Sequence, residues 1–295
     1  MQAAHVTDAK ATASPLMLAA VSLAKRELVR FLRQRSRIIG ALATPLIFWL
    51  FIGSGLNRSF QPAESGLGGP GSGLGEIART GPNPQSAIRN PKSGYLAYFF
   101  PGSLVLVVLF TAIFSTISII EDRNAGFLQG ILVAPVSRTA IVLGKVLGGT
   151  VLATGQGLLF LALAPLAGIK LSVAGTLGAI VLIGLIAFAL TSMGVVLAWR
   201  MDSSAGFHSI MNLLLMPMWV LSGAVFPTEG ASAWLAWIVR VNPLSYGVAG
   251  VRHLLANSGT AFAGMTLATV VTLAFAGVMF LLAVAIVRLP RGNLT

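Results

Sequence analysis

Residues 95–120 read YLAYFFPGSLVLVVLFTAIFSTISII and contain no charged side chain. A helix needs about 20 predominantly apolar residues to cross the ~30 Å hydrocarbon core of a bilayer, and this run is long enough. Within lipid a helix satisfies its own backbone hydrogen-bonding groups, whereas an irregular chain does not. The run therefore predicts a transmembrane helix and places the chain among the all-α membrane proteins.

Five further apolar runs have the length of a membrane span, which gives six predicted transmembrane helices in a domain covering residues 38–287. The further runs are residues 38–56, 141–169, 173–199, 207–228 and 264–287. Lys145 lies near the start of the third predicted span, where its long side chain is expected to reach the membrane interface.

The composition agrees with a membrane protein and argues against a cytosolic enzyme. Of the 295 residues, 9% are charged, whereas about 25% are charged in a typical soluble domain. A net charge of +12 would suggest nucleic acid in a soluble protein, but beside long apolar runs it indicates loops that lie against anionic lipid. Because this charge is assigned to lipid contact, no nucleic-acid partner is predicted. There is no cysteine, and the three histidines are far apart, so no disulfide or metal site is predicted.

The distribution of basic residues predicts the orientation in the membrane. Most Lys and Arg residues fall in the segment 1–37, in the loops after the second and fourth spans, and in the tail 288–295. The positive-inside rule places these parts in the cytoplasm. No short apolar core with a cleavage site precedes the first span, so no cleaved signal peptide is expected. We therefore predict a multi-pass protein of a bacterial inner membrane with both termini in the cytoplasm.

Residues 18–37 have the pattern of an amphipathic helix lying on the cytoplasmic surface. A basic stripe with helical spacing consists of Arg26, Arg30, Arg33 and Arg37. The opposite side consists of Val21, Ala24, Leu28, Phe31 and Leu32. A basic face opposite an apolar face is typical of an interfacial helix. The alternative is a plain positive-inside signal without a special structure.

The first external loop, residues 57–94, is rich in Gly and Pro, which is typical of a flexible loop and not of a packed domain. Gly66, Gly68 and Gly71 have the spacing of a dinucleotide-binding fingerprint. The strand before it and the helix after it are missing, so no nucleotide site is predicted there.

The cytoplasmic loop 121–140 begins with charges and has an apolar middle. Its apolar side chains at helical spacing are Phe127, Leu128, Ile131 and Leu132, which would share one face of a short helix. Pro135 is expected to end that helix. Such a helix could dock into a partner's groove, or it could be a connector packed under the bundle. The pattern alone favours neither.

Nothing in the sequence indicates bond chemistry. The chain lacks a phosphate-binding loop and a nucleophile elbow. Its eight acidic residues fall in predicted termini, loops or span ends, which argues against the proton or sodium relay of an ion-coupled carrier. We expect a transport subunit without its own ATPase site and not an enzyme. The alternative is an autonomous channel or an ion-coupled secondary transporter; a lipid-modifying enzyme would need a polar catalytic cluster, which is not found.

Polar and sulfur-containing side chains occur inside the spans, at Gln156, Asn212 and Met216. Polar groups at such positions most often form hydrogen bonds between helices. The alternative interpretation is that the three side chains line a substrate pathway.

The segment 228–257 has the features of an external re-entrant hairpin. Trp234 and Trp237 are one helical turn apart, and indole rings favour the membrane interface. Pro227 and Pro243 can break the helices on either side. Glu229, near the start, would face water or a polar partner.

Two sets of motifs resemble one known family. The first set is Gly126-Phe127-Leu128, residues 131–138 and Leu143-Gly144-Lys145. The second is Leu221-Ser222-Gly223, Phe226-Pro227, Trp234-Leu235, residues 242–246 and Arg252. In order and spacing they resemble the ABC type-2 permeases, the membrane subunits of ATP-binding-cassette exporters of drugs and lipo-oligosaccharides.

The resemblance implies a permease that pairs with a second copy or a close relative and binds separate ATPase subunits, which hold ATP and Mg²⁺. The cargo would be an amphiphilic drug, a lipid or a lipid-linked saccharide. The coupling helix that receives the ATPase motion would comprise Glu121, Asp122, Arg123, Gly126, Phe127, Leu128, Ile131, Leu132, Pro135 and Arg138. The external gate would comprise Pro227, Glu229, Trp234, Trp237, Asn242, Pro243 and Tyr246.

Overall fold

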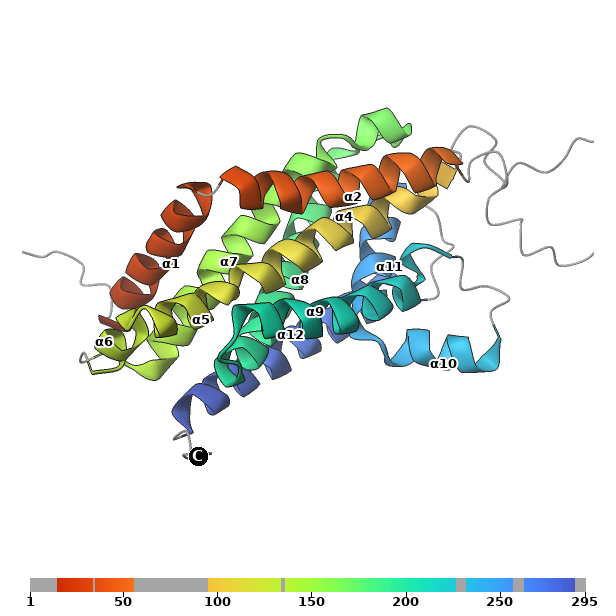
Figure 1. Cartoon of the computed structure of the whole chain (residues 1–295). Helices are drawn as coiled ribbons and strands as arrows, with labels where there is room; N and C mark the ends of the chain where they lie inside the picture. The colour runs from red at the N-terminus through yellow and green to blue at the C-terminus, as the bar shows by residue number, and fades with distance from the viewer. Residues whose placement is uncertain are drawn as a thin grey trace, which may run out of the picture.

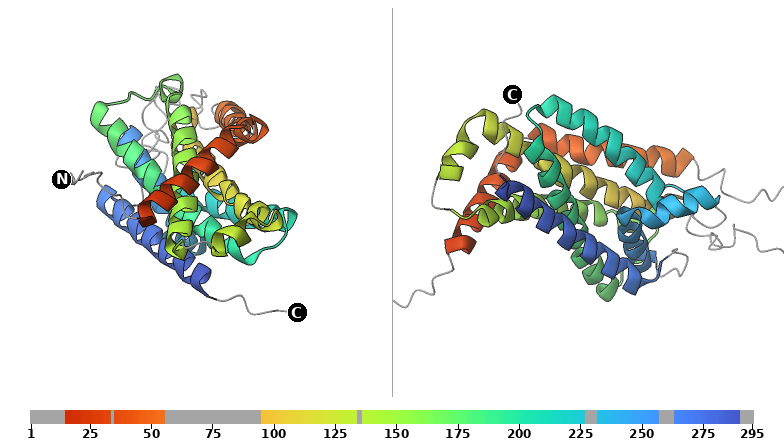
Figure 2. Two further views of the ribbon diagram at one scale, coloured as in Figure 1. Left: turned by 90° about the vertical axis from the view of Figure 1, so that its left-hand side faces the viewer. Right: turned by 90° about the horizontal axis from the view of Figure 1, so that it is seen from below.

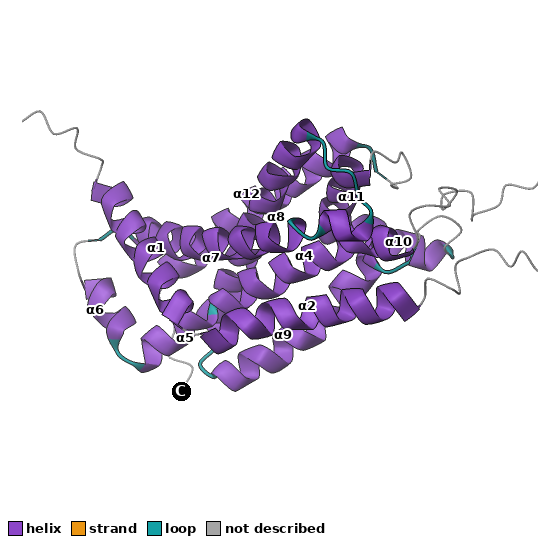
Figure 3. Ribbon diagram, turned by 90° about the horizontal axis from the view of Figure 1, so that it is seen from above, coloured by secondary structure: helices purple, strands orange, loops and turns teal. Residues whose placement is uncertain are grey.

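The computed structural model describes residues 15–33, 35–55, 95–133, 136–226, 232–256 and 263–289, and every regular element within these ranges is helical (Figures 1 and 3). The long helices are α1 (Pro15–Arg33), α2 (Arg35–Gly55), α4 (Tyr95–Ser115), α7 (Arg138–Leu161), α8 (Val173–Arg200), α9 (Ser204–Trp219), α11 (Pro243–Ala256) and α12 (Met265–Arg288). The short ones are α5 (Ile117–Asn124), α6 (Phe127–Val133), α10 (Ala233–Val241), a 3-10 turn (Ala164–Ala167) and a π-helical turn (Val220–Ala224).

Five helical stretches are long and apolar enough to cross a membrane. They are Tyr95–Asn124, Arg138–Leu161, Val173–Arg200, Ser204–Ala224 and Met265–Arg288, and each overlaps one of the predicted spans. The remaining predicted span, residues 38–56, falls on α2, whose apolar part Leu42–Gly53 is shorter. The predicted loop 57–94 lies outside the described residues.

The helix α4 runs through the middle of the bundle. Every residue from Phe99 to Ile113 is buried, and the helix contacts α2, α7, α8, α9 and α11. A helix that is apolar on all sides is expected to be enclosed by other elements. The apolar run 95–120, from which the sequence predicts an all-α membrane protein, therefore forms the core of the bundle.

Serine residues define where three of the long helices begin. Ser137 accepts a hydrogen bond from the backbone N–H of Ala140 at the start of α7. Ser172 and Ser203 do the same for Gly175 in α8 and Gly206 in α9. Each serine satisfies one of the N–H groups that the first turn of a helix leaves unpaired. The apolar runs therefore become helices with defined starting points.

The two ends of the bundle differ. The helices α1, α5 and α6 lie at one end, which we call the α6 end, and α10 lies at the other, the α10 end (Figures 1 and 2). At the α6 end, Arg138 donates to the carbonyl of Val287 at 2.8 Å, and Arg288 donates to Thr139 at 2.9 Å. These bonds join the start of α7 to the end of α12, so these two helix ends lie at the same level of the bundle.

The helix α1 packs closely on α7 because two glycines of α7 carry no side chain there. A Cβ atom on Gly144 would lie 2.7 Å from the Cβ of Leu23 and 2.8 Å from the carbonyl oxygen of Ala20. One on Gly148 would lie 2.9 Å from the Cβ of Glu27. Small residues allow helix backbones to approach closely in membrane proteins. The pair Gly144 and Gly148 thus sets the position of α1.

We predict that Gly144→Ala lowers the free energy of unfolding by about 1–3 kcal/mol, because the added methyl group must displace the α1 backbone. Gly155→Ala on the same helix is the matched control, because a Cβ there meets nothing within 4 Å. Thermal unfolding in detergent, followed by tryptophan fluorescence, measures both. Equal stability of the two variants would contradict the close packing.

Candidate functional site

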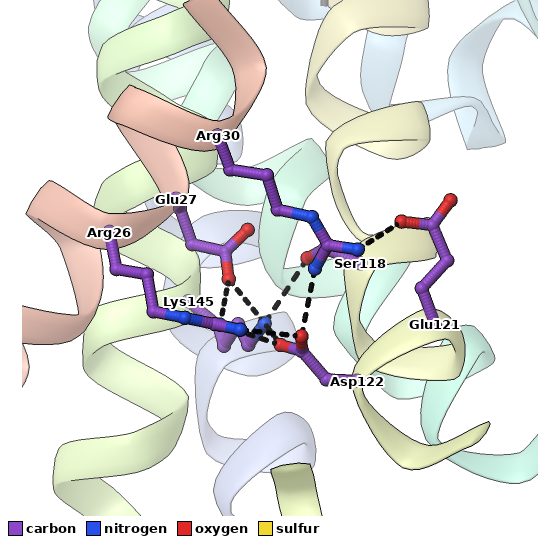
Figure 4. Close-up of polar contacts among 7 residues, drawn as sticks. All are labelled: Arg26, Glu27, Arg30, Ser118, Glu121, Asp122 and Lys145. Atoms are coloured by element: carbon purple, nitrogen blue, oxygen red, sulfur yellow. Dashed lines mark hydrogen bonds and ion pairs between the residues drawn. The ribbon is translucent and has the colours of Figure 1, made fainter. Parts of the chain in front are cut away.

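Seven polar side chains from three helices meet at the α6 end, and we call them the charge cluster (Figure 4). They are Arg26, Glu27 and Arg30 of α1, Ser118, Glu121 and Asp122 of α5, and Lys145 of α7. The cluster thus joins the N-terminal helix, the end of the long helix that contains α4 and α5, and the start of α7.

Lys145 occupies the middle of the charge cluster. Its ammonium group pairs with the carboxylates of Glu27 and Asp122 and donates to the hydroxyl of Ser118 at 3.2 Å. The side chains of Lys145, Glu27 and Asp122 are all buried. The sequence predicts that the charge of Lys145 reaches the membrane interface; in the structure two buried carboxylates hold this charge inside the protein.

Two arginines of α1 complete the charge balance. Arg26 donates two hydrogen bonds to Asp122, at 3.0 and 3.1 Å. Arg30 donates to Asp122 at 2.8 Å and to Glu121 at 2.7 Å. The hydrogen bond to Asp122 raises the pKa of Arg26 above its ordinary value, so the guanidinium stays charged. Three cations then face three carboxylates, and part of the predicted basic stripe of α1 faces these carboxylates.

The predicted coupling segment is made of two helices and not one. Gly126, with φ of 75°, separates α5 from α6, a backbone conformation that glycine adopts without strain. Leu128 is buried in the core of this chain. Phe127 is exposed and has the Arg26 guanidinium 3.6 Å above its ring. Ile131 is partly buried.

The predicted apolar face of the coupling segment is therefore divided, because Leu128 points into the bundle while Phe127 remains outside. Val133, which ends α6, is 88% exposed. The side chain of Leu132, and Pro135 as a whole, lie outside the described residues.

Arg123 fixes the other side of α5. It donates to the carbonyl oxygens of Trp199 and Met201 at 2.9 and 2.8 Å, and to Asp202 at 3.0 Å. It thereby satisfies carbonyls at the end of α8, which a helix terminus leaves unpaired. The helix α5 is thus bound to α1 and α7 through the charge cluster and to the α8–α9 connection through Arg123.

At the α10 end, the last turn of the α9 span is π-helical. Gly223 there has φ of 76°, and the irregular turn releases carbonyl oxygens from the helical pattern. Asn242 donates to the carbonyl of Met218 at 2.6 Å, Arg252 to that of Gly223 at 3.1 Å, and the Tyr95 hydroxyl to that of Val225 at 2.8 Å. Irregular backbone at membrane depth requires such partners.

The predicted gate residues have different surroundings in this region. Asn242 is buried and accepts a hydrogen bond from the Leu244 backbone, and Pro243 begins α11. Tyr246 donates to the carbonyl of Arg240. Trp234 and Trp237 are exposed on α10. Pro227 and Glu229 lie outside the described residues.

Arg252 and Tyr95 were not predicted as functional residues from the residue pattern. Arg252 is buried and lies 4.3 Å above the ring of Tyr98. An arginine in an apolar helix could have been recognised in the sequence as a candidate functional residue, because a buried charge requires a partner. Its partner, a backbone carbonyl, is invisible in the sequence.

The three predicted pathway residues differ in environment. Gln156 is buried in α7 and accepts a hydrogen bond from Thr111 of α4, which is the helix-to-helix contact that polar residues in spans most often make. Asn212 is exposed on α9, and Met216 of the same helix is partly buried. In the part of the chain that the structure describes, no group of three or more His, Asp and Glu side chains could hold a metal ion.

Comparison with known proteins identifies similar sequences. The profile of the ABC-2 type transporter family matches residues 19–256. A putative transport permease, ycf38, of Cyanophora paradoxa is 28% identical over 177 residues, which cover 59% of this chain and 61% of that protein. A probable multidrug ABC transporter permease, YbhR, of Escherichia coli K12 is 26% identical over 162 residues, which cover 53% of this chain and 43% of that protein. The chain thus spans about half the length of the relatives that it matches.

We predict that Lys145→Met destabilises the fold by about 3–5 kcal/mol, because it leaves two buried carboxylates without their cation. Adding Glu27→Gln should recover part of this loss, since it removes one unpaired charge. The measurement is a double-mutant cycle of unfolding free energies, with Lys170→Met on the exposed Lys170 as the control. Strictly additive effects of the two substitutions would show that Lys145 and Glu27 do not interact.

At the α10 end, Tyr95→Phe should cost about 1–3 kcal/mol, because it leaves the buried carbonyl of Val225 without its donor. Tyr246→Phe removes the same atom from a more exposed hydrogen bond and should change stability by less than about 0.5 kcal/mol. Thermal unfolding of the two variants measures the difference. If Tyr246→Phe were the more damaging, the proposed role of Tyr95 in holding the π-helical turn would be wrong.

Proposed function

Because the chain belongs to the ABC-2 type transporter family, we propose that it is the permease subunit of an ABC exporter whose power comes from ATP hydrolysis on a separate subunit. The observation that carries this proposal is α6, a helix of seven residues at the α6 end with Phe127 and Val133 exposed. An exposed apolar side chain on a short surface helix is suited to insertion into a partner's groove.

The contacts of α5 explain how a push on α6 would be transmitted. Leu128 anchors α6 in the core, so α6 cannot move without disturbing the packing beneath it. The neighbouring α5 is bound through Asp122 to α1 and α7. Buried, hydrogen-bonded ion pairs are costly to break. A force on α6 would therefore displace α5, α1 and α7 as one body.

The long helix that contains α4 and α5 connects this body to the α10 end. The first residue of α4, Tyr95, bonds to the carbonyl of Val225. Trp219, at the end of α9, donates from its indole nitrogen to the carbonyl of Gly102 at 2.8 Å. A displacement of α5 along the helix axis would thus reach the π-helical turn, where an external gate would open and close.

The proposed arrangement has six spans, with α2 as the first, α1 as an interfacial helix and α10–α11 as a re-entrant pair. Both termini would lie in the cytoplasm of a bacterium. The α9 span, which leaves His208, Asn212 and Leu213 exposed, would face a second copy of the permease or a close relative, because exposed polar groups in lipid are unfavourable.

The proposed cargo is an amphiphile, either a drug, a lipid or a lipid-linked saccharide. The printed name of the Escherichia coli relative, a probable multidrug ABC transporter permease, supports the first of these. ATP and Mg²⁺ would bind to the ATPase subunit, and the permease would perform no bond chemistry.

We expect Val133→Asp to abolish ATP-driven export while leaving the permease folded, because Val133 is 88% exposed and a charge there would be placed in the apolar groove of the partner. Val173→Asp is the matched control, since Val173 is 80% exposed on α8, outside the predicted coupling loop. Co-purification of the ATPase subunit and cargo export in vesicles are the measurements.

Normal export by the Val133→Asp variant would exclude α6 as the docking element. Flux of cargo through the purified permease alone in liposomes would contradict the larger proposal, because an autonomous channel or an ion-coupled carrier needs no ATPase subunit.

A further inference from the structure

A basic groove of about 590 Å³ lies along α1. It is lined by Ser22, Lys25, Arg26, Val29, Arg30 and Arg33. The side of α1 that packs on α7 carries other residues, among them Ala20, Leu23 and Ala24. The groove is therefore on a face of α1 that the contact with α7 does not use.

Of the four cationic side chains that line the groove, two form ion pairs with other described residues of the chain and two do not. Arg26 and Arg30 pair with Asp122 and Glu121, and the charge cluster is balanced without any further cation. Among the described residues, Lys25 and Arg33 form no ion pair and no hydrogen bond through their side chains. The groove thus offers two surplus positive charges to an anionic ligand.

The surroundings of Lys25 are mainly apolar. On a helix, residues three, four and seven positions away lie on the same face. For Lys25 the exposed apolar residues at these positions are Leu18, Val21, Val29 and Leu32, and the polar one is Ser22. A water-soluble anion or an acidic peptide would neutralise Lys25 and leave these side chains in water. An anionic amphiphile would neutralise the charge and cover the apolar surface together.

We infer that the groove on α1 binds the phosphate headgroup of an anionic phospholipid, with Lys25 and Arg33 on the phosphate and acyl chains along Val21 and Leu32. The lysine stem is long enough to lie on apolar surface while its ammonium reaches the headgroup level. Arg33, at the far end of the groove, provides a planar donor set suited to phosphate oxygens. The bound lipid would hold α1 against the bilayer, and with it the charge cluster.

The test uses the purified full-length permease without any ATPase subunit, so its outcome is independent of the proposed coupling function. Delipidated protein is titrated with phosphatidylglycerol or phosphatidylcholine, and bound lipid is counted by native mass spectrometry. We expect the wild-type protein to prefer phosphatidylglycerol. Lys25→Gln combined with Arg33→Gln should bind it roughly thirtyfold more weakly, because two basic groups near an anionic headgroup are lost.

Two controls accompany the double variant. Arg200→Gln removes an exposed cation at the end of α8 and should leave phosphatidylglycerol binding unchanged. Lys25→Arg keeps both charges and the planar donors of Arg33 and should retain the binding, which separates loss of charge from an altered side-chain shape.

Three results would overturn the inference. The first is phosphatidylglycerol binding by the Gln double variant that equals that of the wild-type protein. The second is displacement of the lipid by an equal concentration of inorganic phosphate, which would indicate a free-anion site. The third, from a separate preparation in which the permease is co-expressed with its ATPase subunit, is unchanged lipid binding by the Gln double variant together with loss of ATPase subunit co-purification, which would assign the groove to an acidic surface of the partner.

Discussion

The burial of the Lys145 ammonium constrains the rest of the α6 end. A charge taken out of water must be paired and hydrogen-bonded, and within the described part of the chain the nitrogen of Lys145 meets Glu27, Asp122 and Ser118. These partners come from α1 and α5, so the three helices have one position in which the charge is satisfied. The glycines of α7 permit that position, because they let α1 approach closely enough for Glu27 to reach.

One long helical stretch connects the charge cluster at the α6 end to the α10 end. The helices α5 and α4 form one apolar stretch, Tyr95–Asn124, and its first residue holds a carbonyl of the irregular turn that ends the α9 span. Buried helices transmit displacement because close-packed interiors deform little. In the proposed function, the charge cluster would receive the motion at the α6 end, and the hydrogen-bonded irregular turn would open at the α10 end.

The sequence predicted what depends on local pattern and failed where distant residues meet. The apolar runs located the five helical stretches that can span a membrane, because length and hydropathy are local properties, although the predicted run 141–169 continues eight residues past the end of its helix at Leu161. The pairing of Glu27 with Lys145 could not be predicted, since it joins residues far apart in the chain. The inward position of Leu128 was left open by the sequence, because an apolar helix face has the same spacing whether it packs on its own core or on a partner.

The central claim is that the charge cluster makes α1, α5 and α6 one rigid body, and a distance measurement between α1 and α6 tests it most directly. The chain has no cysteine, so cysteines placed at the exposed Leu18 and Gln129 carry spin labels at those positions alone. Electron–electron double resonance should give one narrow distance distribution that is the same with and without ATP in the assembled transporter. A shift of that distance during ATP turnover would contradict the account, because α6 would then move without α1.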